Sequence, residues 1–138
     1  MNAFLLTRDI PFIRDLGVEF VSAQDGTAAV ALSPQPRHMN SWGAVHGGVL
    51  MSLLDVAMAV AGRSLYEGAG GAVTIEMKVS FVQPATGASR IQATAHAYHR
   101  SSTMVFCDAE LHDAELRLIA KALGTFKYLK AGETKGSG

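Results

Sequence analysis

The residue with the clearest chemical potential is Asp55, an aspartate inside an apolar stretch of Leu, Val, Ala and Met. An ionised carboxylate in such surroundings is costly unless it is paired or faces a site, and aspartate is a poor residue for a helix interior. Burial raises the pKa of a carboxyl group, which suits it to act as a base or nucleophile. The alternative is a structural carboxylate that faces a polar loop.

The motif His46-Gly47-Gly48 lies just before this stretch. Two glycines let the chain turn tightly and let a ligand approach the backbone. The first N–H groups of a helix have no partner within the helix, so they can donate to an oxygen that gains negative charge during acyl transfer. One such donor contributes roughly 10²–10³-fold to a rate. Without Asp55, the motif would indicate no more than a plain loop.

Other reaction classes lack their motifs in this sequence. There is no Gly-x-Ser-x-Gly elbow and no GxxxxGK[ST] or GxGxxG loop. The five histidines show no paired spacing, so we expect no metal site. Ser52 lies one helical turn before Asp55, where it can bond the carboxylate or cap a backbone carbonyl. Cys107 has apolar neighbours and is interpreted as a core thiol.

A helix must position Asp55, and the sequence predicts one over residues 49–64. Leu, Met and Ala dominate this segment and favour helix. The segment is apolar on nearly every side, which is typical of a buried helix. A shorter helix is expected within residues 4–16, with Pro11 in its first turn. Its inward-facing side chains would be Phe4, Leu5, Phe12, Ile13 and Leu16.

Strand patterns surround the long helix. Asp25-Gly26 between the first two is a hairpin signal. Two strands, one buried helix and four strands predict an α+β fold, in which one curved antiparallel sheet wraps around a central helix. The predicted strands are residues 18–23, 27–32, 72–82, 88–98, 103–112 and 116–129.

The alternation of apolar and polar residues is clearest over residues 72–82. One face is predicted to carry Val73, Ile75, Met77, Val79 and Phe81. The other face is predicted to carry Thr74, Glu76, Lys78 and Ser80.

The bulk properties indicate one domain over residues 1–130 with a disordered tail over residues 131–138. The formal net charge is zero, without blocks of like charge, which argues against nucleic acid or an anionic membrane as a partner. The single cysteine excludes an internal disulfide, and we expect a cytoplasmic protein. The N-terminus is not typical of a signal peptide, and the most apolar segment, residues 49–61, is expected to be too short to span a bilayer.

Taken together, these residues resemble a known family. Asn40, Gly43, His46-Gly47-Gly48 and Asp55 follow the order and spacing of the hotdog-fold thioesterases of the phenylacetate-degradation (PaaI) type, within the 4-hydroxybenzoyl-CoA thioesterase superfamily. The resemblance covers about residues 17–129. It implies a hotdog fold, a homodimer or homotetramer with active sites at the dimer interface, and hydrolysis of an acyl-CoA substrate without a cofactor.

The resemblance also implies roles for five residues. Asp55 would be the nucleophile or general base, and the Gly47 N–H would bind the thioester carbonyl with help from the helix N-terminus. Asn40 and His46 fall where the family orients water or substrate, and Thr74 falls where a small hydroxyl residue holds the water. His46 can instead anchor its loop, and Thr74 can be an ordinary sheet residue. In such a dimer, Asp55 of one subunit would face Gly47 of the other.

The substrate contacts are less defined. Arg100, Ser101 and Ser102 resemble the segment that lies along CoA in relatives, and a guanidinium suits a phosphate; the alternative is a solvated turn. We expect a small aromatic or a short to medium acyl group. Six residues are candidates for its pocket, or else ordinary core: Trp42, Leu50, Met51, Leu54, Met58 and Phe81.

Three alternatives stay open on the same fold. The first is a non-catalytic acyl-CoA-binding protein, which would have little use for the costly carboxylate of Asp55. The second is a dehydratase that acts on acyl-CoA or acyl-carrier-protein, for which His46 leaves room. The third is an α+β dimer in which Asp55 is structural.

Overall fold

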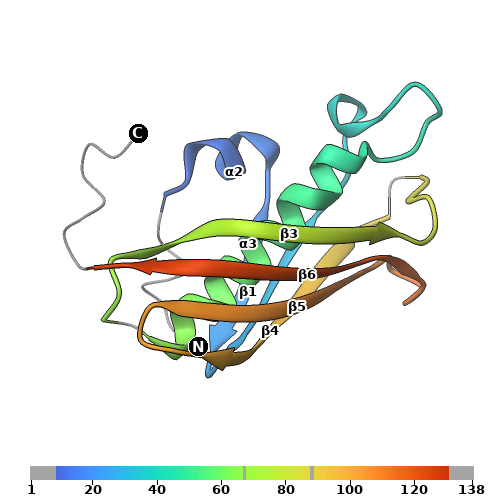
Figure 1. Cartoon of the computed structure of the whole chain (residues 1–138). Coiled ribbons are helices and arrows are strands. Elements are labelled where there is room, and N and C mark those ends of the chain that lie inside the picture. The colour runs from blue at the N-terminus through green and yellow to red at the C-terminus, as the bar shows by residue number, and fades with distance from the viewer. Residues whose placement is uncertain (1–8, 67, 88, 131–138) are drawn as a thin grey trace.

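Six antiparallel strands form one sheet, and a single long helix lies across one face of it (Figure 1). The computed structural model describes residues 9–66, 68–87 and 89–130. The strand order is β1-β2-β4-β5-β6-β3, so β1 and β3 are the two edges. This arrangement confirms the predicted α+β fold. The strands are β1 (Glu19–Gln24), β2 (Thr27–Leu32), β3 (Gly71–Phe81), β4 (Ile91–Arg100), β5 (Met104–His112) and β6 (Leu118–Leu129); the helices are α2 (Pro11–Leu16), the 3-10 turn η1 (Pro36–His38) and α3 (Gly47–Leu65).

The central helix α3 has 19 residues, slightly more than the predicted segment, and 12 of them are buried. The helix extends beyond the apolar residues 49–61 at both ends, and by length and composition alone it is long and apolar enough to cross a membrane. However, 67% of its apolar window is buried inside the protein, as the sheet wraps it. Gly62 permits this close packing, since a Cβ there would lie 2.8 Å from Val105.

The hairpin between β1 and β2 turns at Asp25 and Gly26, as predicted. Both residues have positive φ, 52° and 84°, which is the conformation that a two-residue hairpin turn requires. On the side away from β1, β2 pairs with β4 along its length. Ile91, Ala93 and Ala95 of β4 are buried and alternate with more exposed residues.

Strand β3 contains a bulge, which corrects the predicted alternation. Thr74 and Glu76 pair with neighbouring residues of β6, so Ile75 is an extra residue in β3. Residues paired across antiparallel strands point to the same face, and Thr74 pairs with Phe126, which is fully buried in the core. Thr74 therefore lies on the helix side of the sheet together with Met77, whereas the alternation predicted that these two residues face opposite sides.

The N-terminal helix is shorter than predicted. α2 begins at Pro11 and spans six residues, because proline fits the first turn and not the interior of a helix. Ile13 is buried, but Phe12 is 62% exposed, contrary to the prediction that it faces inward. A helix of under two turns buries only a narrow face. The predicted contacts of Phe4 and Leu5, and the predicted tail over residues 131–138, lie outside the described residues.

Candidate active site

Asp55 and Thr74 form a direct pair at the β3 edge of the sheet. The Thr74 Oγ1 hydroxyl donates to Asp55 Oδ1 at 2.6 Å. Asp55 is half-buried in the middle of α3, and Thr74 is exposed on the edge strand. The bulge in β3 creates the pair, because it turns the Thr74 side chain toward the helix. The carboxylate thus has one fixed partner and one side open to a reactant.

The surroundings raise the pKa of Asp55 above its ordinary value of 3.8. Burial beside apolar helix residues is the larger cause, and the hydrogen bond from Thr74 opposes it by stabilising the charged form. A carboxylate with a raised pKa is a stronger base than an exposed aspartate. Asp55 is therefore suited to remove a proton from water or to attack a carbonyl.

Replacing Thr74 by valine is expected to raise the pKa of Asp55 further. The variant removes the hydrogen bond that lowers the pKa and keeps the branched shape. The change can be followed by the ¹³C shift of the Asp55 carboxyl carbon during a pH titration. Thr74→Ser keeps the hydroxyl and should titrate close to wild type. A Thr74→Val titration that moves to lower pH would contradict the assigned balance of burial and hydrogen bonding.

The N-terminus of α3 presents a backbone donor. His46 is the N-cap, and its Nδ1 accepts from the Gly48 N–H at 2.8 Å. Ser52 donates to the Gly48 carbonyl at 2.8 Å, so it caps the backbone rather than bonding Asp55. Among the residues that the structure describes, no acceptor takes the Gly47 N–H. Gly47 can therefore donate to a ligand oxygen, and His46 holds the turn that exposes it.

Asn40 organises the loop beside this donor. Its Oδ1 accepts from the N–H groups of Trp42 at 2.8 Å and Ala44 at 3.1 Å. These two donors fix the orientation of the amide, since its oxygen must face them. The Nδ2 group is left to donate elsewhere. Asn40 and Gly47 line one cavity, so both donors border the same space.

That cavity has a volume of about 280 Å³ and lies where two loops meet at the start of α3. The loop before α3 and the loop after β3 come together there (Figure 1), through the Val45 N–H to Ala85 carbonyl bond at 2.9 Å. We call it the helix-end cavity. Its lining is Asn40, Ala44, Val45, Gly47, Leu50, Phe81, Val82, Gln83, Pro84 and Ala85.

The predicted site residues fall into two groups within one chain. Asn40, His46 and Gly47 gather at the start of α3, whereas Asp55 and Thr74 lie near its middle. Asp55 is eight residues along α3 from Gly47, which corresponds to about 12 Å at 1.5 Å per residue. One thioester carbonyl cannot contact both groups of the same chain.

The predicted CoA segment lies at the other end of α3. The Arg100 guanidinium lies 4.4 Å from the ring centroid of Tyr66 and donates to the Ser101 carbonyl at 3.2 Å. The Ser101 hydroxyl accepts from two backbone N–H groups of the β4–β5 turn, so it holds the turn. The stacked guanidinium keeps N–H groups for a phosphate, because stacking uses its face and not its edge.

Ser102 lines a neighbouring cavity of about 580 Å³ together with Lys127 and Lys130. These two lysines could not be recognised from the sequence, because they stand far from Ser102 along the chain. The pairing of β5 with β6 brings them to the turn, where Met104 pairs with Lys127. Together with Arg100, they make this end of the fold basic.

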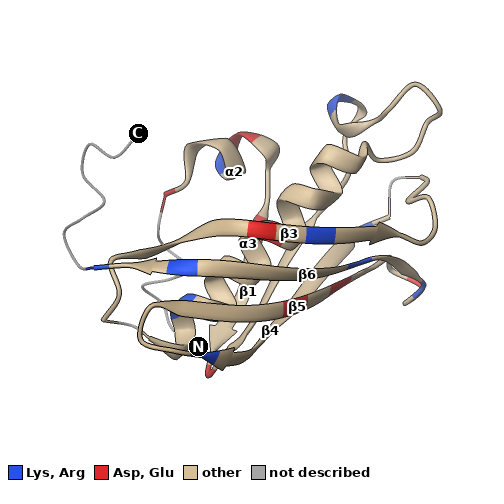
Figure 2. Cartoon of the chain, in the orientation of Figure 1, with Lys and Arg blue, Asp and Glu red and all other residues tan. Residues whose placement is uncertain are grey.

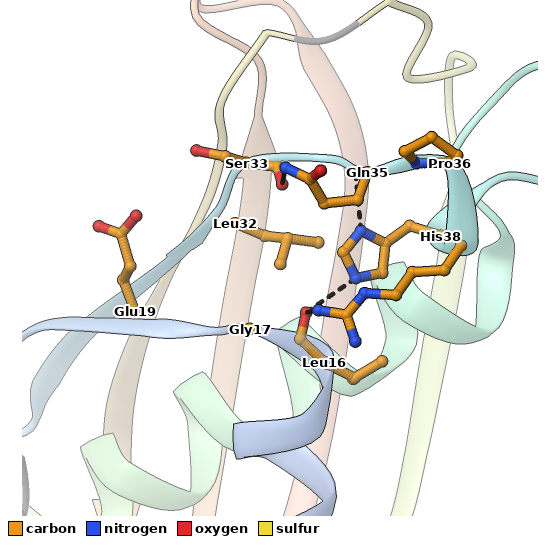
Figure 3. A pocket seen from close by; sticks show the side chains of 9 residues that line it. Leu16, Gly17, Glu19, Leu32, Ser33, Gln35, Pro36 and His38 are labelled. Carbon is orange, nitrogen blue, oxygen red and sulfur yellow. Dashed lines mark hydrogen bonds between the residues drawn. The ribbon is translucent and has the colours of Figure 1, made fainter.

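A further cavity, of about 620 Å³, lies elsewhere, around η1 and the end of α2 (Figure 3). Its central residue, His38, is 1% exposed. His38 Nδ1 accepts from the Gln35 N–H at 2.9 Å, and its other nitrogen bonds the Leu16 carbonyl at 2.8 Å. Glu19 at the rim is paired with Arg90. These groups are already satisfied by the protein, so the cavity is a structural junction and not a reaction site.

Replacing His38 by phenylalanine is expected to destabilise the protein without touching the candidate site. The Gln35 N–H would lose its acceptor, and the Leu16 carbonyl would keep only the bond from Arg37 Nη2 at 3.3 Å. One buried unpaired group costs about 1–3 kcal/mol. Chemical denaturation measures the loss. His96→Phe, at an exposed position on β4, is the control and should leave the denaturation midpoint unchanged. Equal midpoints for both variants would refute the structural role of His38.

The remaining candidates separate by burial. Leu54 and Met58 are fully buried core residues, whereas Trp42 is 89% exposed. Cys107 is a buried thiol whose pKa is raised to about 12, first by burial and then by the charge of Asp108, which confirms it as an inert core residue. Among the described residues, no group of three His, Cys, Asp or Glu side chains could hold a metal ion.

Known proteins resemble this chain in sequence and in fold. Residues 43–120 match the Thioesterase superfamily. The chain is 30% identical over 122 residues to acyl-coenzyme A thioesterase 13 of Homo sapiens, covering 87% of this chain and 86% of that protein. It is 28% identical over 132 residues to the medium/long-chain acyl-CoA thioesterase YigI of Escherichia coli strain K12, covering 85% and 84%. The PaaI protein of the E. coli phenylacetic acid degradation operon superposes with a TM-score of 0.85 at 25% identity, covering 94% of this chain and 92% of that chain.

The sheet wraps around one helix, and this helix carries a carboxylate at its middle and a free N–H at its start. These features are those of a hotdog-fold thioester hydrolase. The match over residues 43–120 shows that the chain belongs to the thioesterase superfamily, and its structural neighbours place it with the PaaI type.

Proposed function

We propose that the protein hydrolyses an acyl-CoA with a small aromatic or a short to medium acyl group, and releases a carboxylic acid and free CoA. The observation that carries the proposal is the Asp55 carboxylate, which is half-buried, has a raised pKa and is held by Thr74. Relatives named as acyl-CoA thioesterases support CoA as the carrier.

The chemistry follows from the two donors and the carboxylate. The Gly47 N–H and Asn40 Nδ2 bind the carbonyl oxygen and stabilise the negative charge that it gains. Asp55 either takes a proton from water, which adds to the carbonyl carbon, or attacks that carbon itself to form a mixed anhydride that water then cleaves. In both routes the C–S bond breaks, and CoA leaves as a thiolate that takes up a proton. The reaction needs no cofactor and no metal.

We propose that two subunits build each site. Because Asp55 and Gly47 of one chain are too far apart, Asp55 would act on a carbonyl held by Gly47 and Asn40 of the partner subunit. Strand β3 supports this arrangement, since it is an edge strand whose outer side has no neighbour in the described chain. Val73 and Ile75 on this strand are 41% and 53% exposed. Such an edge is suited to pairing with a second copy.

Antiparallel pairing of two β3 strands would produce the required geometry. A two-fold axis near the middle of β3 would bring the Thr74 end of one strand beside the Phe81 end of the other. Phe81 lies next to Gly47 in its own chain. The Asp55–Thr74 pair would therefore meet the helix-end cavity of the partner. Two such dimers can pair again into a tetramer.

The basic end of α3 is proposed to bind the CoA nucleotide. Arg100 and Ser102 would contact phosphates, with Lys127 and Lys130 in the same cavity, while Ser101 maintains the turn. Elsewhere the charges are mixed: Figure 2 shows acidic and basic residues interspersed over the strands, without a block of one sign. We therefore propose that neither nucleic acid nor a membrane is a partner. We also propose a cytoplasmic location.

The test is steady-state hydrolysis of a panel of aromatic and aliphatic acyl-CoAs, with detection of the free thiol. We expect thiol release from at least one member. Binding without thiol release would make the protein an acyl-CoA binder, and loss or gain of water in the acyl chain with the thioester intact would make it a dehydratase. Either result would overturn the proposed function.

A further inference from the structure

The lining of the helix-end cavity is mostly apolar. Its polar groups are Gln83, whose amide donates to the Leu118 carbonyl, and the polar corner formed by Asn40 and Gly47. Asn40 and Gly47 supply the two polar contacts described above, and most of the remaining lining is aliphatic, aromatic or proline, including Leu50, Phe81 and Pro84. A carbonyl held at the polar corner has two substituents, the acyl chain and the sulfur of the pantetheine arm. Only one of them can enter this cavity.

The chemistry of the lining selects the acyl chain. The pantetheine arm carries two amides, and burying an amide without hydrogen-bond partners is unfavourable. A hydrocarbon chain or ring gains free energy from the same surroundings. We therefore expect the acyl group to enter the cavity. The pantetheine arm would then extend away from it, toward solvent and the basic end of α3.

Phe81 lines this cavity beside the carbonyl donor. It ends β3, and its ring edge lies 3.5 Å from the position of a Cβ on Gly47, so it stands directly beside the carbonyl donor. Its side chain is 53% exposed, although it is aromatic and lines the cavity. In the proposed dimer this ring would stand between the Gly47 donor of its own chain and the partner's Asp55–Thr74 pair, where the acyl group must lie.

We propose that Phe81 is the specificity-determining residue of this enzyme, and that its ring limits the length and width of the acyl group. This inference rests on the proposed thioesterase function. An apolar cavity of about 150 Å³ accommodates benzene. The helix-end cavity, of about 280 Å³, has room for one phenyl ring with a short linker or for a chain of several carbons. Longer chains must displace Phe81.

The experiment compares kcat/KM across saturated acyl-CoAs of increasing length, together with benzoyl-CoA and phenylacetyl-CoA, for wild type, Phe81→Ala, Phe81→Leu and Phe81→Trp. We expect Phe81→Ala to raise the ratio of the longest to the shortest substrate by about tenfold or more. Phe81→Leu should shift it less, and Phe81→Trp should shift it toward shorter chains. Leu123→Ala, which removes a side chain of similar exposure on β6, should leave the profile unchanged.

Opposite shifts for a smaller and a larger side chain are the signature of a pocket wall, and a merely structural residue would not give them. A uniform loss across all substrates in every Phe81 variant, or an unchanged profile, would overturn the proposal while the thioesterase function stands. If wild type hydrolyses no member of the panel, the proposed function fails as well, so the two failures are distinguishable.

Discussion

Asp55→Asn is expected to lower kcat for acyl-CoA hydrolysis by about 10²–10⁴-fold, the range attributed to a positioned general base. Asparagine keeps the shape of the side chain and can still accept the hydrogen bond from Thr74, so the variant removes charge and basicity alone. Steady-state assays with the best substrate of wild type measure the effect. Activity that survives unchanged would show that Asp55 is not the catalytic carboxylate.

The same variant should be more stable than wild type at neutral pH. Because burial raises the pKa of Asp55, the folded protein binds this proton more tightly than the unfolded chain does. The stabilisation is therefore present below the unfolded pKa of about 3.8 and is lost as pH rises through the folded pKa. Ionisation of the buried carboxyl group opposes folding, so Asp55→Asn should raise Tm at pH 7, by an amount that shrinks toward pH 4. A lower Tm at pH 7 would contradict this.

Asn40→Asp is expected to give the second large loss, about 10²–10³-fold in kcat/KM, as for removal of one oxyanion donor. Aspartate retains the oxygen that accepts from Trp42 and Ala44, so the loop should keep its conformation. It replaces the Nδ2 donor by an acceptor, which would repel the negative charge on the carbonyl oxygen.

Asn40→Ala provides the comparison for this variant. It removes both the donor and the anchor of the loop, so it should lose activity and also lower Tm. If Asn40→Asp keeps full activity while Asn40→Ala does not, Asn40 acts only by holding the loop, and its assignment as a substrate contact is wrong.

Local signals in the sequence were sufficient for most of the fold. The Asp25-Gly26 turn and the apolar segment around Asp55 fixed the hairpin and the central helix, because turn chemistry and helix propensity act over a few residues. The side of the sheet that Thr74 faces could not be predicted. It depends on the bulge at Ile75, which arises from pairing with a distant strand and leaves no mark in the alternation.

The candidate site was predictable only in part for the same reason. The motif at residues 46–48 indicated a helix start, and the structure shows that His46 caps this helix. It also shows that the Asn40 side-chain amide is held in one orientation by a loop N–H group. Lys127, and the residues after β3 that line the helix-end cavity, come from segments brought together by the fold, so spacing along the chain did not reveal them. The distance between Asp55 and Gly47 became clear only from the structure, in which both residues lie on one continuous helix.

The central claim, that each site combines Asp55 of one subunit with Asn40 and Gly47 of the other, is tested most directly by mixing two inactive variants. Asp55→Asn and Asn40→Asp are unfolded together in equal amounts, refolded and assayed for thiol release. Every mixed dimer would contain one site with both native residues, so we expect recovery of about a quarter of the wild-type activity in a two-fold symmetric dimer. If each chain carries a complete site of its own, the mixture will be no more active than the two variants refolded separately, and the account of a shared site is wrong.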